Sequence, residues 1–91
     1  MLLADVALGK EKEFTKDTYM EKPPPGFHST KALGSIEPDT KQYKHHPEGY
    51  VVPCGPITNS GHKDVSCREH QYIVYDVSQA HLRYLIHLNW N

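Results

Sequence analysis

The stretch Gln71-Tyr72-Ile73-Val74-Tyr75-Asp76 decides the fold of this chain. Four consecutive aromatic or β-branched residues, uninterrupted by Gly or Pro, favour a β-strand. An apolar run flanked by polar residues is typical of a strand covered on both faces, and Gln71 then stands where the strand begins. A rigid scaffold aims such a strand-end side chain toward a cleft, so Gln71 is a candidate functional residue.

The segment from His81 to Trp90 alternates between apolar and polar residues. Its even positions are apolar and its odd positions polar, with Leu85 as the one exception. This period of two predicts a strand with one dry face and one wet face. Because only the short link from Asp76 to Ala80 separates the two segments, we expect them to form an antiparallel pair.

Composition limits the size of the core and the class of partner. The 91 residues suffice for one small domain, and all seven prolines lie between Pro23 and Pro56, which leaves the apolar residues near the two ends. A formal net charge of -1 gives no electrostatic reason to expect direct nucleic-acid binding. No segment has the length of a membrane span. Residues 1–5 lack the basic start of a signal peptide, so we expect Cys54 and Cys67 to be reduced thiols.

The remaining segments carry weaker signals. Leu2 to Leu8 predicts a third strand, buried on most of both faces, and Glu11 to Lys16 predicts a helical turn without a convincing cap. Short strands are expected from His28 to Leu33 and from Tyr50 to Val52. Residues 34–47 and 56–68 are expected to be loops, the second with a turn at residues 59–61. Loops of this length inside a compact domain are often functional.

Five pieces of the chain, in the right order, resemble the C-terminal half of the catalytic domain of the poly(ADP-ribose) polymerases, which are diphtheria-toxin-like ADP-ribosyltransferases. The matching pieces are Leu2-Leu3-Ala4-Asp5-Val6-Ala7-Leu8-Gly9; Pro24-Pro25-Gly26-Phe27-His28-Ser29-Thr30-Lys31-Ala32-Leu33-Gly34; Pro38-Asp39; Val51-Val52-Pro53; and Tyr72-Ile73-Val74-Tyr75-Asp76 with Gln79 and Leu82-Arg83-Tyr84-Leu85-Ile86. The resemblance covers nearly the whole chain.

The resemblance implies an α+β fold that is predominantly antiparallel β, with two packed sheets, a cleft for nicotinamide adenine dinucleotide (NAD) and a long acceptor-side loop. Residues 1–91 would be the C-terminal part of a single ADP-ribosyltransferase catalytic domain. The implied reaction releases nicotinamide from NAD, which is the substrate, and transfers ADP-ribose to a protein acceptor or a growing polymer. The family is often nuclear, so the resemblance implies a nuclear protein, and a cytoplasmic location stays open. Because no segment has the length of a membrane span, we expect no membrane partner.

The family's catalytic set is a His in a His-Gly-Ser-type motif, a Tyr on a later strand and a Glu at the mouth of the strand that reads Glu-Tyr-Ile-Val-Tyr. The first two precede the part of the domain that matches this chain, so the missing N-terminal half of the domain becomes an expected partner. By its context, His28-Ser29-Thr30 matches the start of the acceptor-side loop and not the His motif. The third position is Gln71, which the resemblance makes the catalytic and cofactor-binding residue.

The exchange of Glu for Gln changes the chemistry at this position. The carboxylate accepts a hydrogen bond from the nicotinamide ribose, opposes the positive charge that develops at the anomeric carbon and helps to activate the acceptor hydroxyl. The carbonyl of Gln71 can still accept a hydrogen bond, but it carries no charge and takes no proton. Electrostatic stabilisation of this kind is worth about 10²–10³ in rate, and general-base help about 10²–10⁴. We expect polymer elongation to be lost and single transfer or NAD hydrolysis to be weak.

Arg68, Glu69 and His70 fall where the acceptor-side loop meets the catalytic strand, so they are acceptor-side candidates, although a solvated loop explains them equally well. Glu69 could replace the lost carboxylate only with difficulty. On a regular strand it shares a face with Gln71 but lies about 6.5–7 Å further along.

Two alternatives from other classes stay open. The first is a pseudoenzyme or binding remnant of the domain, because Gln71 is neutral and the upstream catalytic residues are absent. The second is a small zinc-stabilised module, since several His and Cys residues lie in the loops and a small core profits from a structural metal. These residues are His45, His46, Cys54, His62, Cys67 and His70. No Cys-x-x-Cys pair is present, so we assign no metal site.

Overall fold

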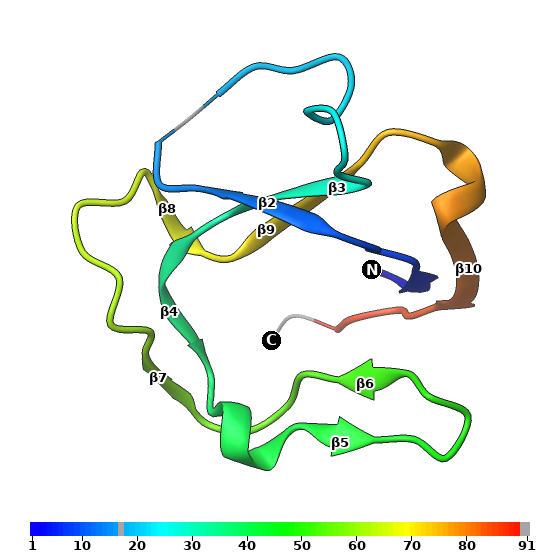
Figure 1. The fold of residues 1–91 in the computed structure, drawn as a ribbon. Coiled ribbons are helices and arrows are strands. Elements are labelled where there is room, and N and C mark those ends of the chain that lie inside the picture. The colour runs from blue at the N-terminus through cyan, green and yellow to red at the C-terminus, as the bar shows by residue number, and fades with distance from the viewer. Residues whose placement is uncertain (17, 90–91) are drawn as a thin grey trace.

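The computed structural model describes residues 1–16 and 18–89, and short β-strands account for nearly all of its regular structure (Figure 1). The strands are β1 (Leu2–Val6), β2 (Glu11–Phe14), β3 (Ser29–Ala32), β4 (Gly34–Pro38), β5 (Lys44–His45), β6 (Val51–Val52), β7 (Ile57–Asn59), β8 (Cys67–Glu69), β9 (Gln71–Val74) and β10 (Ala80–Leu85). Two 3₁₀ helices span Thr40–Gln42 and Val77–Gln79. None of the described helices is long and apolar enough to cross a membrane.

The strands form four small sheets, ordered β1-β10, β2-β3-β9, β7-β4-β8 and β5-β6. Four of the six strand pairs are antiparallel, and the pairs β2-β3 and β4-β8 are parallel. The prediction of a predominantly antiparallel β structure is therefore confirmed. The described residues form four small sheets, however, in place of the two packed sheets that were expected.

The second and third sheets meet at a corner where two chain segments change sheets together. Only Leu33 separates β3 from β4, and only His70 separates β8 from β9. On one side of the corner β3 and β9 pair antiparallel, and on the other side β4 and β8 pair parallel. Leu33 is 6% exposed and is the one buried hydrophobic side chain that the described residues contain. The small core therefore lies at this corner.

The helical part of the α+β prediction is not confirmed. The described residues contain no α-helix, and the predicted helical turn from Glu11 to Lys16 is wrong, because Glu11–Phe14 forms β2. Pairing with β3 supplies the backbone partners that an uncapped helical turn lacks, in the register Glu11↔Ser29 to Phe14↔Ala32. Strand pairing across the chain thus prevails over weak local propensity.

The predicted antiparallel pair of the two closing strands is also wrong. β9 pairs with β3, whereas β10 pairs with β1 at the opposite end of the sequence. The link between them is a 3₁₀ helix with a capping box, in which Asp76 accepts from the backbone and Gln79 reaches back to the Asp76 amide. This capped turn sends the chain to a different sheet, so it cannot act as a hairpin (Figure 1).

The strands at residues 2–8, 28–33, 50–52 and 71–76 are confirmed, but the predicted burial of the first and last is wrong. Leu2, Leu3, Tyr72 and Ile73 are all exposed, because each lies in a sheet of two or three strands whose outer faces the described chain leaves open. The dry face expected after His81 is exposed at Leu82, Tyr84 and Leu88, and β10 ends at Leu85. Trp90, the last member of that pattern, lies outside the described residues.

The two predicted loops contain more structure than expected. Residues 34–47 hold β4, β5 and a 3₁₀ helix, and residues 56–68 hold β7 and the start of β8. These strands are only two to five residues long, which is too short for a local period to announce them. Those other than β5 also pair with segments far along the chain. The turn at residues 59–61 is confirmed, since the Gly61 amide donates to Asn59 Oδ1 over 2.8 Å.

Candidate functional site

Gln71 begins β9, as the sequence predicts, and its side chain is exposed. Across the β3-β9 pair it lies opposite Ala32, while Ile73 lies opposite Thr30. Because side chains alternate along a strand, Gln71 and Ile73 share one face of the sheet with Thr30 and Ala32. Phe14 joins this face through its parallel register with Ala32. The amide of Gln71 therefore stands on an open face and is not packed into hydrocarbon.

This face forms the floor of a hollow of about 480 Å³, which we call the Gln71 hollow. Its lining is Phe14, Lys16, Thr18, Tyr19, Met20, Thr30, Ala32, Cys67, Gln71 and Ile73. Apolar and aromatic side chains with a few polar groups are the usual composition of a small-molecule site. The hydroxyl of Thr30 is held 2.9 Å from that of Tyr75, which fixes the floor beside β9.

The opposite face of the same sheet carries a cation–π pair. Lys31 lies opposite Tyr72, one position along from Gln71, and its ammonium lies 5.2 Å from the centre of the Tyr72 ring. Burial, the largest single influence, lowers the pKa of Lys31, but attraction to Tyr72, Glu11 and Glu13 outweighs it. The net result is a Lys31 pKa above the ordinary value of 10.5. This cation belongs to the back of the sheet and does not reach the Gln71 hollow.

His70, the residue before Gln71, is held at the corner by both of its ring nitrogens. The Gly34 amide donates to its Nδ1 over 2.9 Å, and its Nε2 lies 2.7 Å from Oε2 of Glu37. The two side chains are 7% and 21% exposed, respectively. His70 therefore links the start of β9 to β4, the central strand of the neighbouring sheet.

The other two acceptor-side candidates are exposed on β8. Arg68 keeps its side chain at the surface while its carbonyl accepts from the Ser35 hydroxyl over 3.4 Å. Glu69 lies opposite Ile36 in the sheet of β4, and His70 separates it from β9. The regular strand assumed between Glu69 and Gln71 is thus broken at the corner. Glu69 does not line the Gln71 hollow.

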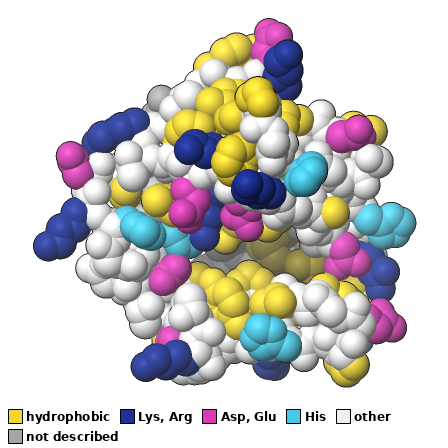
Figure 2. Space-filling view, in the orientation of Figure 1, with side chains coloured by type: hydrophobic (Ala, Val, Ile, Leu, Met, Phe, Trp, Pro, Cys, Tyr) yellow, Lys and Arg dark blue, Asp and Glu magenta, His cyan; other side chains and the backbone are white. Residues whose placement is uncertain are grey.

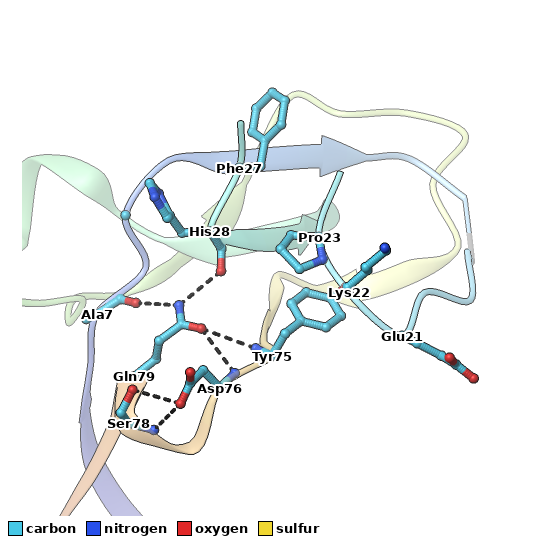
Figure 3. Close-up of a pocket in the computed structure, with 11 residues that line it drawn as sticks. Ala7, Glu21, Lys22, Pro23, Phe27, His28, Tyr75, Asp76, Ser78 and Gln79 are labelled. Atoms are coloured by element: carbon cyan, nitrogen blue, oxygen red, sulfur yellow. Dashed lines mark hydrogen bonds between the residues drawn. The ribbon is translucent and has the colours of Figure 1, made fainter. Parts of the chain in front are cut away.

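A second hollow, of about 640 Å³, lies at the other end of β9 (Figure 3). Gln79 stands beside it and ties three segments together. Its Nε2 donates to the carbonyls of Ala7 and His28, each over 3.0 Å, and its Oε1 accepts from the amides of Tyr75 and Asp76. Figure 3 shows these four bonds converging on one carboxamide. With its amide fully used in this way, Gln79 is structural.

Asp76 shapes the same turn. Hydrogen bonds from the Ser78 amide, at 2.9 Å, and from the Ser78 hydroxyl, at 2.8 Å, hold the pKa of Asp76 below its ordinary value of 3.8. The carboxylate therefore caps the 3₁₀ helix that separates β9 from β10.

The loop histidines and cysteines do not assemble into a metal site. Within the described ranges, no group of three or more His, Cys, Asp or Glu side chains is arranged to hold a metal ion. The rings of His62 and His70 lie 6.0 Å apart, edge to face. Cys54 and Cys67 are both free thiols, as the sequence predicts.

Several residues of the Gln71 hollow escaped sequence reasoning. Phe14 enters through the parallel β2-β3 register, and Tyr19, Met20 and Cys67 come from segments outside β9 and β3. Nothing in their local sequence marks them, because long-range pairing brings them together. A third hollow, of about 680 Å³, lies between the β1-β10 pair and the β5-β6 hairpin. Figure 2 shows hydrophobic side chains gathered around a hollow in the face viewed there.

Sequence comparison with known proteins places this chain in a family. The sequence model of the poly(ADP-ribose) polymerase catalytic domain matches residues 1–90. The chain is 43% identical over 86 residues to poly [ADP-ribose] polymerase 1 of Arabidopsis thaliana, covering 94% of this chain and 9% of that protein. It is 40% identical over 91 residues to poly [ADP-ribose] polymerase 1 of Danio rerio, covering 100% of this chain and 9% of that protein.

A third relative carries a different activity in its name. The chain is 38% identical over 94 residues to protein mono-ADP-ribosyltransferase PARP3 of Mus musculus, covering 98% of this chain and 18% of that protein. The chain thus spans less than a fifth of the length of each of these relatives. The family's catalytic domain uses NAD as its substrate. The match over residues 1–90 shows that this chain belongs to the poly(ADP-ribose) polymerase catalytic-domain family.

Proposed function

We propose that this chain is the C-terminal part of an NAD-dependent ADP-ribosyltransferase catalytic domain and that the Gln71 hollow is its contribution to the NAD cleft. One observation carries the proposal. The residue at the family's Glu position begins β9 with its side chain exposed, and it lines a hollow of about 480 Å³. Family membership supports the same assignment.

The chemistry follows from the amide. Gln71 contacts the nicotinamide ribose through its carbonyl oxygen, and Thr30, Ile73 and Phe14 shape the floor beneath it. The amide offers no negative charge to the anomeric carbon as the bond to nicotinamide breaks, and it accepts no proton from an acceptor hydroxyl. The domain therefore makes at most single transfers of ADP-ribose to a protein side chain, or slow NAD hydrolysis, and does not extend a polymer.

The rest of the domain is the partner that this chain needs. Leu82, Tyr84 and Leu85 of β10 and Leu2 of β1 are exposed, and Leu85 retains 81% of its accessible surface. A two-stranded sheet with apolar residues exposed in this way is marginal in water. We assign the missing N-terminal half of the catalytic domain as the element that covers this pair and supplies the His and Tyr of the family's catalytic set. The protein acceptor is the second partner. On family grounds we place the protein in the nucleus or cytoplasm.

Glu69 and Arg68 are proposed to face the acceptor, because both are exposed on β8 next to the corner. His70 is assigned to the fold, since both of its ring nitrogens are bonded to β4. Glu69 is not proposed to replace the family's Glu, because it lies in a different sheet from Gln71.

A pseudoenzyme or binding remnant is the second candidate, and the neutral Gln71 favours it. One experiment separates the two. This chain is fused behind the upstream half of the catalytic domain of a relative, and the product is incubated with NAD and an acceptor protein. Released nicotinamide and single ADP-ribose adducts support the transferase. A fusion that binds NAD without releasing nicotinamide supports the remnant, and long polymer chains made with Gln71 in place contradict both.

The isolated chain provides the matching control. It should release negligible nicotinamide from NAD, because the residues that complete the site are absent. Turnover by the isolated chain that disappears in Gln71→Ala would show that the site is complete without an upstream half.

A further inference from the structure

We propose that His70 is a positioning residue, which directs the side chain of Gln71 into the Gln71 hollow through its bonds to Gly34 and Glu37. The functional meaning of this inference rests on the function proposed above, while the geometric part concerns the described chain alone. His70 was a candidate contact for the acceptor, and the structure gives its ring a different use.

The corner at His70 decides which way β9 faces. A slip of one residue in the phase of a strand moves every side chain to the other face. If β9 entered the sheet one residue out of phase, Tyr72 would face the hollow and Gln71 would join Lys31 on the back. Strand β9 is short and, among the described residues, pairs only with β3, over four residue positions. This pairing alone is therefore a modest constraint on its register.

His70 adds a fixed point directly before Gln71. Its ring is 7% exposed and bonded on both sides to β4, at the Gly34 amide and at the Glu37 carboxylate. The close fit of the two chains tightens this point, because a Cβ on Gly34 would lie 2.6 Å from the His70 backbone nitrogen. The ring and the backbone of His70 are thus held against the same strand.

The two bonds also settle the tautomer. Nδ1 accepts from the Gly34 amide and so carries no proton, which places the proton on Nε2. Nε2 then donates to Glu37, in a charge-assisted bond of 2.7 Å. Neither nitrogen is left to bind an acceptor, and the ring acts only through its neighbour Gln71.

Nuclear magnetic resonance of the isolated chain tests the proposal with the side-chain amide signal of Gln71, identified by its loss in Gln71→Ala. In His70→Ala we expect this signal to shift and the Gly34 amide to exchange with solvent about tenfold faster. His70→Asn retains an oxygen that can accept from the Gly34 amide, so it should restore most of both readouts. In the unmodified chain, ring nitrogen spectra should report the Nε2–H tautomer.

His28→Ala is the matched control. His28 also accepts a backbone bond on Nδ1, from the Lys10 amide over 3.0 Å, but it lies beside the second hollow. It should leave the Gln71 signal in place. The proposal is overturned if His70→Ala moves that signal no more than His28→Ala does. If His70→Ala does not fold, Glu37→Ala decides, since it removes the partner through which His70 Nε2 is held to β4. An unmoved Gln71 signal in that variant overturns the proposal as well.

Titration with NAD keeps this proposal separate from the proposed function. If the His70 variants shift the Gln71 signal but NAD never does, in the chain or in the completed domain, positioning stands and the NAD cleft is wrong. If NAD perturbs Gln71 equally in the unmodified chain and in His70→Ala, the cleft stands and positioning fails.

Discussion

Gly34→Ala is the substitution that most sharply tests the sheet corner. A Cβ at this position would lie 2.3 Å from the carbonyl carbon of Glu69 and 2.6 Å from its Cα. Ordinary contact begins near 3.4 Å, so the two strands would have to separate by about 1.1 Å. Every atom in the way belongs to the backbone of β8 or His70, and therefore no side chain can rotate to make room.

The expected cost is large for a single methyl group. Overpacking usually costs about 1–3 kcal/mol, and a clash with backbone atoms alone belongs at the upper end, near 3 kcal/mol. For a domain of this size, that lowers the melting temperature by roughly 12–24 °C. Separation of the strands would also weaken the bond from the Gly34 amide to His70 and the 2.6 Å bond from the Ser60 hydroxyl to the Gly34 carbonyl.

Gly61→Ala is the matched control. Gly61 has φ of 85° and open space around its Cβ position, so its substitution costs only backbone strain, about 1 kcal/mol. The assay is denaturant unfolding of both variants beside the unmodified chain, followed by circular dichroism. The reasoning is refuted if Gly34→Ala is destabilised by no more than Gly61→Ala, since the corner would then tolerate a side chain.

Two further predictions concern the turn after β9. Gln79→Ala removes a carboxamide that bonds four backbone groups, so the free energy of unfolding should fall by about 1–3 kcal/mol. Gln79→Glu should be at least as damaging, because it sets a carboxylate against two carbonyls. A neutral result for both variants in denaturant unfolding would contradict the structural role of Gln79. Asp76 should titrate in the folded chain with a midpoint below 3.8, since the Ser78 bonds favour its charged form. Its contribution to stability is then present above pH 3.8 and lost as the pH falls through the lower folded value. Ser78→Ala should raise the midpoint measured by carboxyl carbon resonances, and an unchanged midpoint would show that the hydroxyl does not matter.

Local sequence predicted the parts of the fold that depend on local residues. The β-branched and aromatic run after Gln71 marked β9, and Val51-Val52 marked β6, because such residues suit a pleated backbone. Asn59 and Gly61 marked their turn because Asn and Gly favour turn geometry. The position of Gln71 at the start of its strand followed from the change from polar to apolar residues at that point.

Pairing and burial could not be predicted in the same way. Strand β10 follows β9 along the chain but pairs with β1. Next to this pair the Met1 amino group donates to the carbonyl of Ile86, 85 residues away in the sequence. A period of two shows that a strand has two different faces, but it does not show which neighbouring element covers either face. In β10 every residue is exposed within the described chain. The parallel pairing of β2 with β3 left no local trace either. Most of the Gln71 hollow depends on such pairing, which is why only Gln71 itself was found from sequence.

The central claim is that a neutral amide occupies the place of a catalytic carboxylate at the edge of an NAD cleft. The most direct test is the rate of nicotinamide release from NAD by the completed domain, with Gln71 and with Gln71→Glu. We expect the carboxylate to raise the rate by at least about tenfold. An equal rate for Gln71 and Gln71→Glu would contradict the account, because the start of β9 would then not face the reacting centre.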